Sequence, residues 1–213
     1  MSLLTIKDVT FQDFLDYPEI VVEAGKITFL TGASGSGKST LLRLLNGVLS
    51  ASAGVINYQG KNIVEYSAIQ LRRELLLVSQ AVYLFDSTIE ENFKAFYEYR
   101  DEPLISRDKM KEYLAICAID MPLDSDCQVL SGGERHRVFM AINLSFDAVV
   151  YMFDEPTSAL DYQNAQLVME NITRFVKDRN KTLLIISHDK HLAEAYGDNI
   201  INLSKGQEEH PSE

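Results

Sequence analysis

Continuously apolar runs alternate with amphipathic stretches over most of the chain. Residues 148–153 are apolar throughout, and residues 182–187 are apolar except for Thr182 and Ser187 at the two ends, which is typical of parallel strands covered on both faces. Strands that alternate with helices predict an α/β fold with a mostly parallel sheet. The expected strands are Leu4–Val9, Ile27–Thr31, Val55–Tyr58, Leu75–Ser79, Ala148–Phe153, Thr182–Ser187 and Asn199–Leu203, and the expected helices are Ser39–Val48, Ser67–Glu74 and Tyr162–Arg179.

The middle of the chain has a different pattern. From Thr88 to Phe146 the apolar spacing is helical and no strand signal intervenes. The helices expected there are Ile89–Tyr99, Arg107–Ala118 and Gly133–Ser145. The pattern predicts one domain, with an α/β core (1–80 and 147–213) and an inserted helical subdomain (81–146). The acidic tail Gly206–Glu213 is expected to fray.

Composition narrows the classes of partner. The net charge of −11 disfavours broad binding to nucleic acid or to an anionic lipid surface. No stretch approaches the roughly 18 consecutive apolar residues of a membrane span, and the first residues lack the features of a signal peptide. We therefore expect a cytoplasmic chain without direct membrane insertion. Cys117 and Cys127 lack metal-ligand spacing and are expected to be free thiols.

The segment Gly32–Thr40 carries the strongest chemical signal. It reads GASGSGKST and matches the phosphate-loop pattern G-x-x-x-x-G-K-[ST]. A strand-like run precedes it and a helix-like run follows, which is the context that the motif requires. Glycines let the backbone approach a phosphate, and the N–H groups of the helix start then face its charge. A Gly/Ser-rich surface turn is the much weaker alternative.

Two further segments fit a phosphate site. Asp154 and Glu155 follow an apolar strand, at the sheet edge where ligands of α/β folds bind. Asp154 suits Mg²⁺ and Glu155 suits activation of a water, although the pair could merely cap the helix after Pro156. The run Leu130–Glu134 opens a helix with paired glycines, either as a second anion site or as an ordinary capped helix start. A second anion site would fit a head-to-tail dimer, in which this loop covers the partner's nucleotide.

Taken together, these motifs resemble the ATP-binding subunit of an ABC transporter over essentially the whole length. The signature loop LSGGQ of that family corresponds to Leu130–Glu134, with Glu134 in the last place. Gln80 matches the Q-loop glutamine, Ser158–Asp161 the D-loop, and His188 the switch histidine. Within the family, the likeness is greatest to the ATPase of small two-component bacterial exporters proposed to move iron. The resemblance implies a P-loop NTPase core with a small antiparallel β part beside the parallel sheet.

The resemblance also implies the ligands and the roles of single residues. ATP and Mg²⁺ are the expected ligands. The implied catalytic residues are Glu155, His188 and Gln80, and the implied metal ligands are Ser39, Gln80 and Asp154. The implied nucleotide contacts are Gly32, Ser34, Gly35, Ser36, Gly37, Lys38, Ser39, Thr40 and, from the opposite subunit, Ser131, Gly132 and Gly133.

The adenine contact departs from the family pattern. The tyrosine expected near Asp13 is missing, so Phe11 or Phe14 could stack on the base, with core packing an equal alternative for Phe11. The remaining histidines match no family position and are expected to be surface or structural residues: His136, His191 and His210.

The implied function is ATP hydrolysis that powers transport through a separate transmembrane permease. The ATPase subunits would pair as a homodimer or with a homologue, and the permease would hold them at the inner face of the membrane. The apolar segment Ala81–Phe85 is either the surface that receives the permease or part of the core. A soluble cassette acting on nucleic acid or ribosomes, and a nucleotide-binding module without catalysis, are the alternatives.

Overall fold

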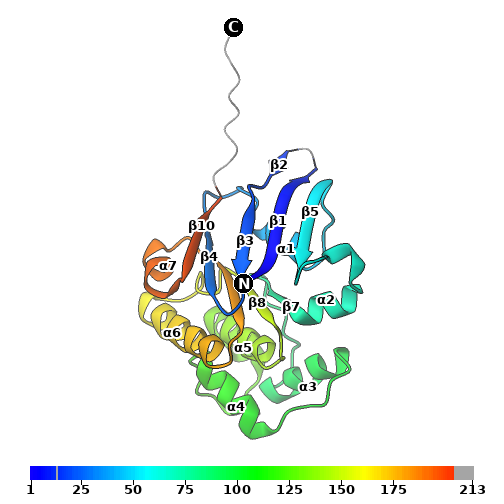
Figure 1. Ribbon diagram of the computed structural model, residues 1–213. Helices are drawn as coiled ribbons and strands as arrows, with labels where there is room; N and C mark the ends of the chain where they lie inside the picture. The colour runs from blue at the N-terminus through cyan, green and yellow to red at the C-terminus, as the bar shows by residue number, and fades with distance from the viewer. Residues whose placement is uncertain (13, 204–213) are drawn as a thin grey trace.

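A parallel sheet forms the centre of the fold. The computed structural model describes residues 1–12 and 14–203, and Figure 1 shows their arrangement. The sheet has the strand order β10-β4-β9-β8-β7, and all neighbouring strands run parallel. The α/β fold with a mostly parallel sheet is thereby confirmed. These strands are β4 (Ile27–Thr31), β7 (Leu75–Val78), β8 (Val150–Asp154), β9 (Thr182–Ile186) and β10 (Asn199–Asn202).

An antiparallel sheet lies beside it, at the top of Figure 1. Its strands follow the order β2-β1-β5-β6, and β3 also pairs with β1. The sequence predicted parts of β1 and β5, whereas β2, β3 and β6 were missed because strands of two to four residues leave little periodic signal. The strands are β1 (Ser2–Phe11), β2 (Leu15–Asp16), β3 (Ile20–Glu23), β5 (Ala53–Tyr58) and β6 (Lys61–Asn62).

Two hydrophobic clusters cover the two faces of the parallel sheet. In β9, Leu183 and Ile185 belong to one cluster, while Leu184 and Ile186 belong to the other. The alternation follows from the two-residue period of a strand, and burial of both sets explains the continuously apolar sequence. On one face, the helix α1 (Lys38–Leu45) packs in the same cluster as residues of the antiparallel sheet. The phosphate loop before α1 is thus anchored by both sheets.

Helices cover the other face of the parallel sheet. The helix α6 (Tyr162–Asp178) packs on β9, and α7 (Lys190–Tyr196), which the sequence did not predict, contacts α6 and β4. The described residues 88–146 contain no strand, only an isolated bridge between Thr88 and Asp126. The remaining helical elements are η1 (Ile63–Glu65), α2 (Ala68–Glu74), α3 (Ile89–Tyr99), α4 (Arg107–Ile116), η2 (Cys127–Val129) and α5 (Gly132–Leu144).

The structure also places the cysteines and most of the histidines. Cys117 and Cys127 are both free and buried. His136 is buried, whereas His191 is exposed. His210 and the tail Gly206–Glu213 lie outside the described residues. Within residues 1–12 and 14–203, no helix has the length and apolar character needed to cross a membrane.

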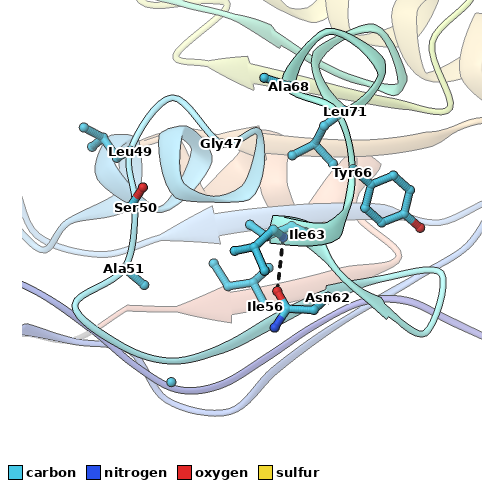
Figure 2. A pocket seen from close by; sticks show the side chains of 12 residues that line it. Gly47, Leu49, Ser50, Ala51, Ile56, Asn62, Ile63, Tyr66, Ala68 and Leu71 are labelled. Atoms are coloured by element: carbon cyan, nitrogen blue, oxygen red, sulfur yellow. Dashed lines mark hydrogen bonds between the residues drawn. The ribbon is translucent and has the colours of Figure 1, made fainter.

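A hollow of about 260 Å³ opens between the end of α1, β5 and α2. Figure 2 shows the apolar side chains of Leu49, Ile56, Ile63 and Leu71 around it. Asn62 lies at its rim, where its side chain accepts a hydrogen bond from the backbone of Val64. None of the residues expected to bind nucleotide lines this hollow.

A buried asparagine fixes the segment that joins β7 to α3. Asn92 is fully buried on α3, and its carbonyl oxygen accepts a hydrogen bond of 2.7 Å from the backbone N–H of Phe85. Its amide group donates to the backbone oxygens of Phe85 and Thr88 and to the hydroxyl of Ser87. One side chain therefore satisfies a turn that has no regular secondary structure of its own.

Asn92→Ala is expected to lower the free energy of unfolding by about 1 to 3 kcal/mol, because it leaves the partly buried N–H of Phe85 without its acceptor and removes a fully buried side chain. Urea denaturation measures this loss. Lys94→Ala, on the exposed side of the same helix, is the control and should cost less than about 0.5 kcal/mol. A cost below about 1 kcal/mol for Asn92→Ala would contradict the structural role given to this residue.

Candidate nucleotide-binding site

The phosphate loop links a buried strand to a buried helix. Chain direction reverses between Thr31, the end of β4, and Lys38, the start of α1. Gly32 has a φ of 143°, and a Cβ placed on it would lie 2.2 Å from the backbone oxygen of Leu203. Gly37 has a φ of 86°, and a Cβ there would lie 2.8 Å from the hydroxyl of Tyr17. Both positions therefore require glycine for steric reasons.

The start of α1 differs from every other described α-helix. Helices α2 to α7 each begin with a side chain that accepts a hydrogen bond from a backbone N–H of the first turn. Helix α1 begins at Gly37 with no such side-chain cap. The hydroxyl of Ser36 is also buried and has no hydrogen-bond partner in the described part of the chain. The uncapped N–H groups of the first turn of α1 and the hydroxyl of Ser36 could all donate to a phosphate group. A phosphate would then take the place of the side-chain cap that the other helices have.

Lys38 supplies the positive charge of this loop. The side chain is almost fully buried, with 5% exposed. Its ammonium group donates to the backbone oxygens of Gly32 and Ala33, at 2.9 and 2.8 Å. The loop therefore curls around its own lysine, which holds the ammonium group beside the helix start.

Tyr17 is a contact that the sequence did not reveal. Its hydroxyl donates to the backbone oxygen of Gly37, at 2.9 Å. Burial raises the pKa of Tyr17 to about 12, against the opposing effect of a hydrogen bond with Thr40. Tyr17 therefore fixes the backbone at the start of α1 through this hydrogen bond. A tyrosine before a short strand carries no motif, so only the folded chain places it here.

A carboxylate and a hydroxyl meet beside the loop. Asp154 ends β8 and accepts a hydrogen bond of 3.1 Å from the hydroxyl of Ser39. Burial raises the pKa of Asp154, and the neighbouring Glu155 adds to that rise, because both disfavour its charged form. A hard cation such as Mg²⁺ would compensate this buried charge, and it commonly takes few carboxylates and several waters. The described residues hold no group of three His, Cys, Asp or Glu side chains that could bind a metal.

Three predicted residues from separate strands come together. The imidazole Nε2 of His188 lies 2.9 Å from Oε1 of Glu155, and the amide nitrogen of Gln80 lies 3.4 Å from Oε2. Glu155 has a φ of 54°, an unfavourable backbone conformation for a residue with a side chain. Its N–H donates to the backbone oxygen of Ile186, which fixes this conformation. Such strain commonly marks functional positions.

A cleft of about 320 Å³ opens beside this cluster. Glu155 and His188 line it together with Ser158 of the predicted D-loop. The hydroxyl of Ser158 donates to the backbone oxygen of Glu155, at 3.0 Å. The predicted D-loop is thus bonded to the backbone of the residue that carries the predicted catalytic carboxylate.

The signature loop lies at the start of α5. Ser131 caps this helix, and a Cβ on Gly132 would meet nothing within 4 Å. A Cβ on Gly133 would lie 3.0 Å from the backbone oxygen of Ala159 in the D-loop. No hydrogen bond or ion pair joins Ser131, Gly132 or Gly133 to the phosphate loop among residues 1–12 and 14–203. Gly132 therefore faces open space on the surface of the chain.

The two aromatic candidates for adenine differ in exposure. Phe11 is partly buried and packs against the cluster around α1. Phe14 is 67% exposed. Asp13 lies outside the described residues. Stacking on adenine by either phenylalanine stays a prediction.

Comparison with known proteins finds relatives over most of the chain. A family model described as "ABC transporter" matches residues 15–158. The ATP-dependent lipid A-core flippase of Vibrio cholerae is 33% identical over 215 residues, which cover 95% of this chain and 36% of the flippase. The probable iron export ATP-binding protein FetA of Escherichia coli K12 is 32% identical, covering 79% of this chain and 75% of that protein. The chain spans about a third of the length of the flippases that it matches.

Solved structures share the fold. The dimeric structure of MJ0796, a bacterial ABC transporter cassette, has a TM-score of 0.83 and 22% sequence identity, covering 96% of this chain and 95% of that one. The same cassette in a dimeric post-hydrolysis state, bound to ADP and Pi, has a TM-score of 0.80. At this identity the likeness establishes the fold, a cassette with a parallel sheet, an antiparallel sheet and a helical part.

Asp154→Asn is expected to leave the free energy of unfolding of the metal-free protein unchanged or to raise it by about 1 kcal/mol. The substitution removes a charge that burial disfavours and keeps an oxygen that can accept from Ser39. Since the folded-state pKa is raised, the gain should be present at alkaline pH and vanish at acidic pH, where the carboxyl group is protonated in both states.

Urea denaturation in a chelator, at several pH values, measures this effect. Asp178→Asn, which removes an exposed carboxylate at the end of α6, is the control and should change stability little at any pH. A loss of more than about 2 kcal/mol for Asp154→Asn at alkaline pH would contradict the expectation.

Proposed function

The chain belongs to the ABC transporter family, and from this premise we propose that it binds and hydrolyses ATP to power a separate transmembrane permease. The observation that carries the proposal is the cluster of Gln80, Glu155 and His188. Glu155 directly follows the end of β8, while Gln80 and His188 each come two residues after the ends of β7 and β9. They meet at one edge of the sheet, beside the partly buried pair Ser39–Asp154.

Binding would use the loop and the start of α1. The N–H groups from Gly35 to Ser39 and the hydroxyl of Ser36 would hold the phosphate oxygens of ATP. Lys38 would exchange its bonds to backbone oxygens for the charged β- and γ-phosphates, which are stronger acceptors. Ser39, Asp154 and Gln80 would hold Mg²⁺, which supplies positive charge to the phosphates when it is bound.

Hydrolysis would depend on Glu155. Its carboxylate is suited to accept a proton from an attacking water, as a general base. The side chains of His188 and Gln80 contact both carboxylate oxygens and so restrict its orientation. His188 would also donate to the γ-phosphate. Because the hydroxyl of Ser158 donates to the backbone oxygen of Glu155, movement of the D-loop would shift the position of the catalytic carboxylate.

A second cassette would complete the site. Within the part of the chain that the structure describes, Ser131, Gly132 and Gly133 make no hydrogen bond to their own phosphate loop, and a Cβ on Gly132 would meet nothing within 4 Å. Head-to-tail pairing would place these residues over the γ-phosphate of the partner, twice in a symmetric dimer. The partner would be a second copy of this chain or a homologue. The dimeric form of the similarly folded MJ0796 cassette supports this arrangement.

The permease would dock near the segment Ala81–Phe85. In this segment Val82 and Leu84 pack against the core, whereas Tyr83 and Phe85 are 70% and 45% exposed. Phe85 stacks on Tyr99 of α3, which is 80% exposed. This aromatic surface belongs to residues 81–146, which we propose form the helical subdomain between the core residues 1–80 and 147–213.

The permease would also hold the chain at the inner face of the membrane and determine the cargo. The names of two relatives support this division, because one is called a probable iron export ATP-binding protein and the other a lipid A-core flippase. Their ATP-binding parts are similarly close to this chain. The cassette therefore supplies the motor, and the transported molecule depends on the transmembrane partner.

Lys38→Ala is expected to weaken ATP binding about 10- to 100-fold, because a charge-assisted contact to phosphate is lost. Titration calorimetry with MgATP measures this change. Lys109→Ala removes an exposed lysine that pairs with Glu112 and serves as the matched control. Equal affinities for both variants would refute the role of the phosphate loop.

Glu155→Gln is expected to keep ATP binding, to lower turnover about 100- to 10,000-fold and to trap an ATP-dependent dimer, because only the general base is lost. Phosphate release and size-exclusion chromatography with ATP provide the two readouts. Glu194→Gln, an exposed carboxylate on α7, is the control. A variant that hydrolyses ATP at the normal rate, or that stays monomeric with ATP, would contradict the proposal.

A further inference from the structure

The hydroxyl group of Ser131 is already engaged within its own chain. It donates a hydrogen bond of 2.7 Å to the carboxylate of Glu134, and the N–H of Ser131 donates to the same oxygen at 2.8 Å. The hydroxyl also accepts from the N–H of Glu134, at 3.3 Å. These contacts form a capping box at the start of α5. Because a hydroxyl has one proton, Ser131 cannot donate to Glu134 and to a phosphate at the same time.

Glu134 also brings negative charge to this helix start. The hydrogen bonds from Ser131 lower the pKa of Glu134, and Arg137 lowers it further. The side chain is only partly buried. A γ-phosphate that approaches Ser131 would therefore meet a carboxylate beside the hydroxyl that is meant to bind it.

We infer that Glu134 is a positioning residue that restrains the pairing of two cassettes. It holds the proton of Ser131 away from the incoming γ-phosphate and opposes the charge of that phosphate. Pairing then requires the Ser131–Glu134 bond to break, which raises the ATP concentration that dimerisation needs. The inference rests on the proposed head-to-tail dimer and adds a regulatory element to it.

A capping box accepts glutamine as well as glutamate, so the charge of Glu134 is not needed to start α5. Glu134→Gln removes the charge and keeps an oxygen that can accept from Ser131. A neutral acceptor holds the hydroxyl proton less strongly than a carboxylate does. The substitution therefore changes the two features that the inference invokes and leaves the helix cap in place.

The chain offers a matched control within α3. Thr88 and Glu91 form a second capping box, in which the N–H and the hydroxyl of Thr88 donate to one oxygen of Glu91 at 3.1 and 3.2 Å. Glu91→Gln makes the same chemical change at the start of another helix. Any effect that arises only from helix capping should appear in both variants.

The experiment compares Glu134→Gln and Glu91→Gln, each combined with Glu155→Gln, which suppresses turnover. Light scattering after size exclusion measures the ATP concentration at half-maximal dimer. We expect Glu134→Gln to lower it about fivefold and Glu91→Gln to leave it unchanged. The difference should shrink at 1 M salt, where the screening length falls to about 3 Å.

Ser131→Ala tests the part played by the hydroxyl. In that background Glu134→Gln should give a clearly smaller gain, because no hydroxyl proton is left to release. A full gain in the absence of the hydroxyl would overturn the positioning role. An unchanged or higher ATP requirement in Glu134→Gln, or an equal shift in Glu91→Gln, would also overturn it.

The test separates this inference from the function on which it rests. If Glu155→Gln dimerises with ATP and Glu134→Gln makes no difference, only the role of Glu134 fails. If Glu155→Gln forms no dimer at any ATP concentration, pairing itself fails, and the restraint fails with it.

Discussion

The common direction of the central strands is the constraint on which the site depends. Strands β7, β8 and β9 are hydrogen-bonded in parallel, so their carboxyl ends lie at one edge of the sheet. The residues that follow these ends are Gln80, Glu155 and His188, which come from distant parts of the sequence. Hydrophobic burial on both faces fixes the register of these strands, since a shift by one residue would turn each apolar set to the wrong cluster. The chemistry at the edge is therefore positioned by the packing of the core.

The same edge concentrates features that do not favour stability. Asp154 is a buried carboxylate with a raised pKa, Glu155 has a left-handed backbone conformation, and the hydroxyl of Ser36 is buried without a partner in the described part of the chain. Each would be removed easily by substitution if stability alone mattered. Their grouping around the start of α1 is consistent with a site whose unfavourable terms are offset when a charged ligand binds.

Much of the fold and most of the predicted site follow from the sequence for physical reasons. β4 and α3 begin and end where expected, because a buried strand and a capped amphipathic helix leave clear periodic signals. β2, β3, β6 and α7 were missed, since elements this short depend on tertiary contacts. The role of Tyr17 could not be predicted either, because it depends on a tertiary contact with Gly37, which is twenty residues away in the sequence.

The starts of α1 and α5, which would both contact a nucleotide in the proposed dimer, differ in how their first N–H groups are capped. Helix α1 leaves its first N–H groups without a side-chain cap, so binding of a phosphate to it displaces no capping contact. Helix α5 satisfies itself through Ser131 and Glu134, so any phosphate must compete with an internal carboxylate. One chain can therefore hold nucleotide on its own loop more readily than it can close over the nucleotide of a partner. In the proposed head-to-tail dimer this asymmetry would separate binding from pairing, so that the two steps would respond to different ATP concentrations.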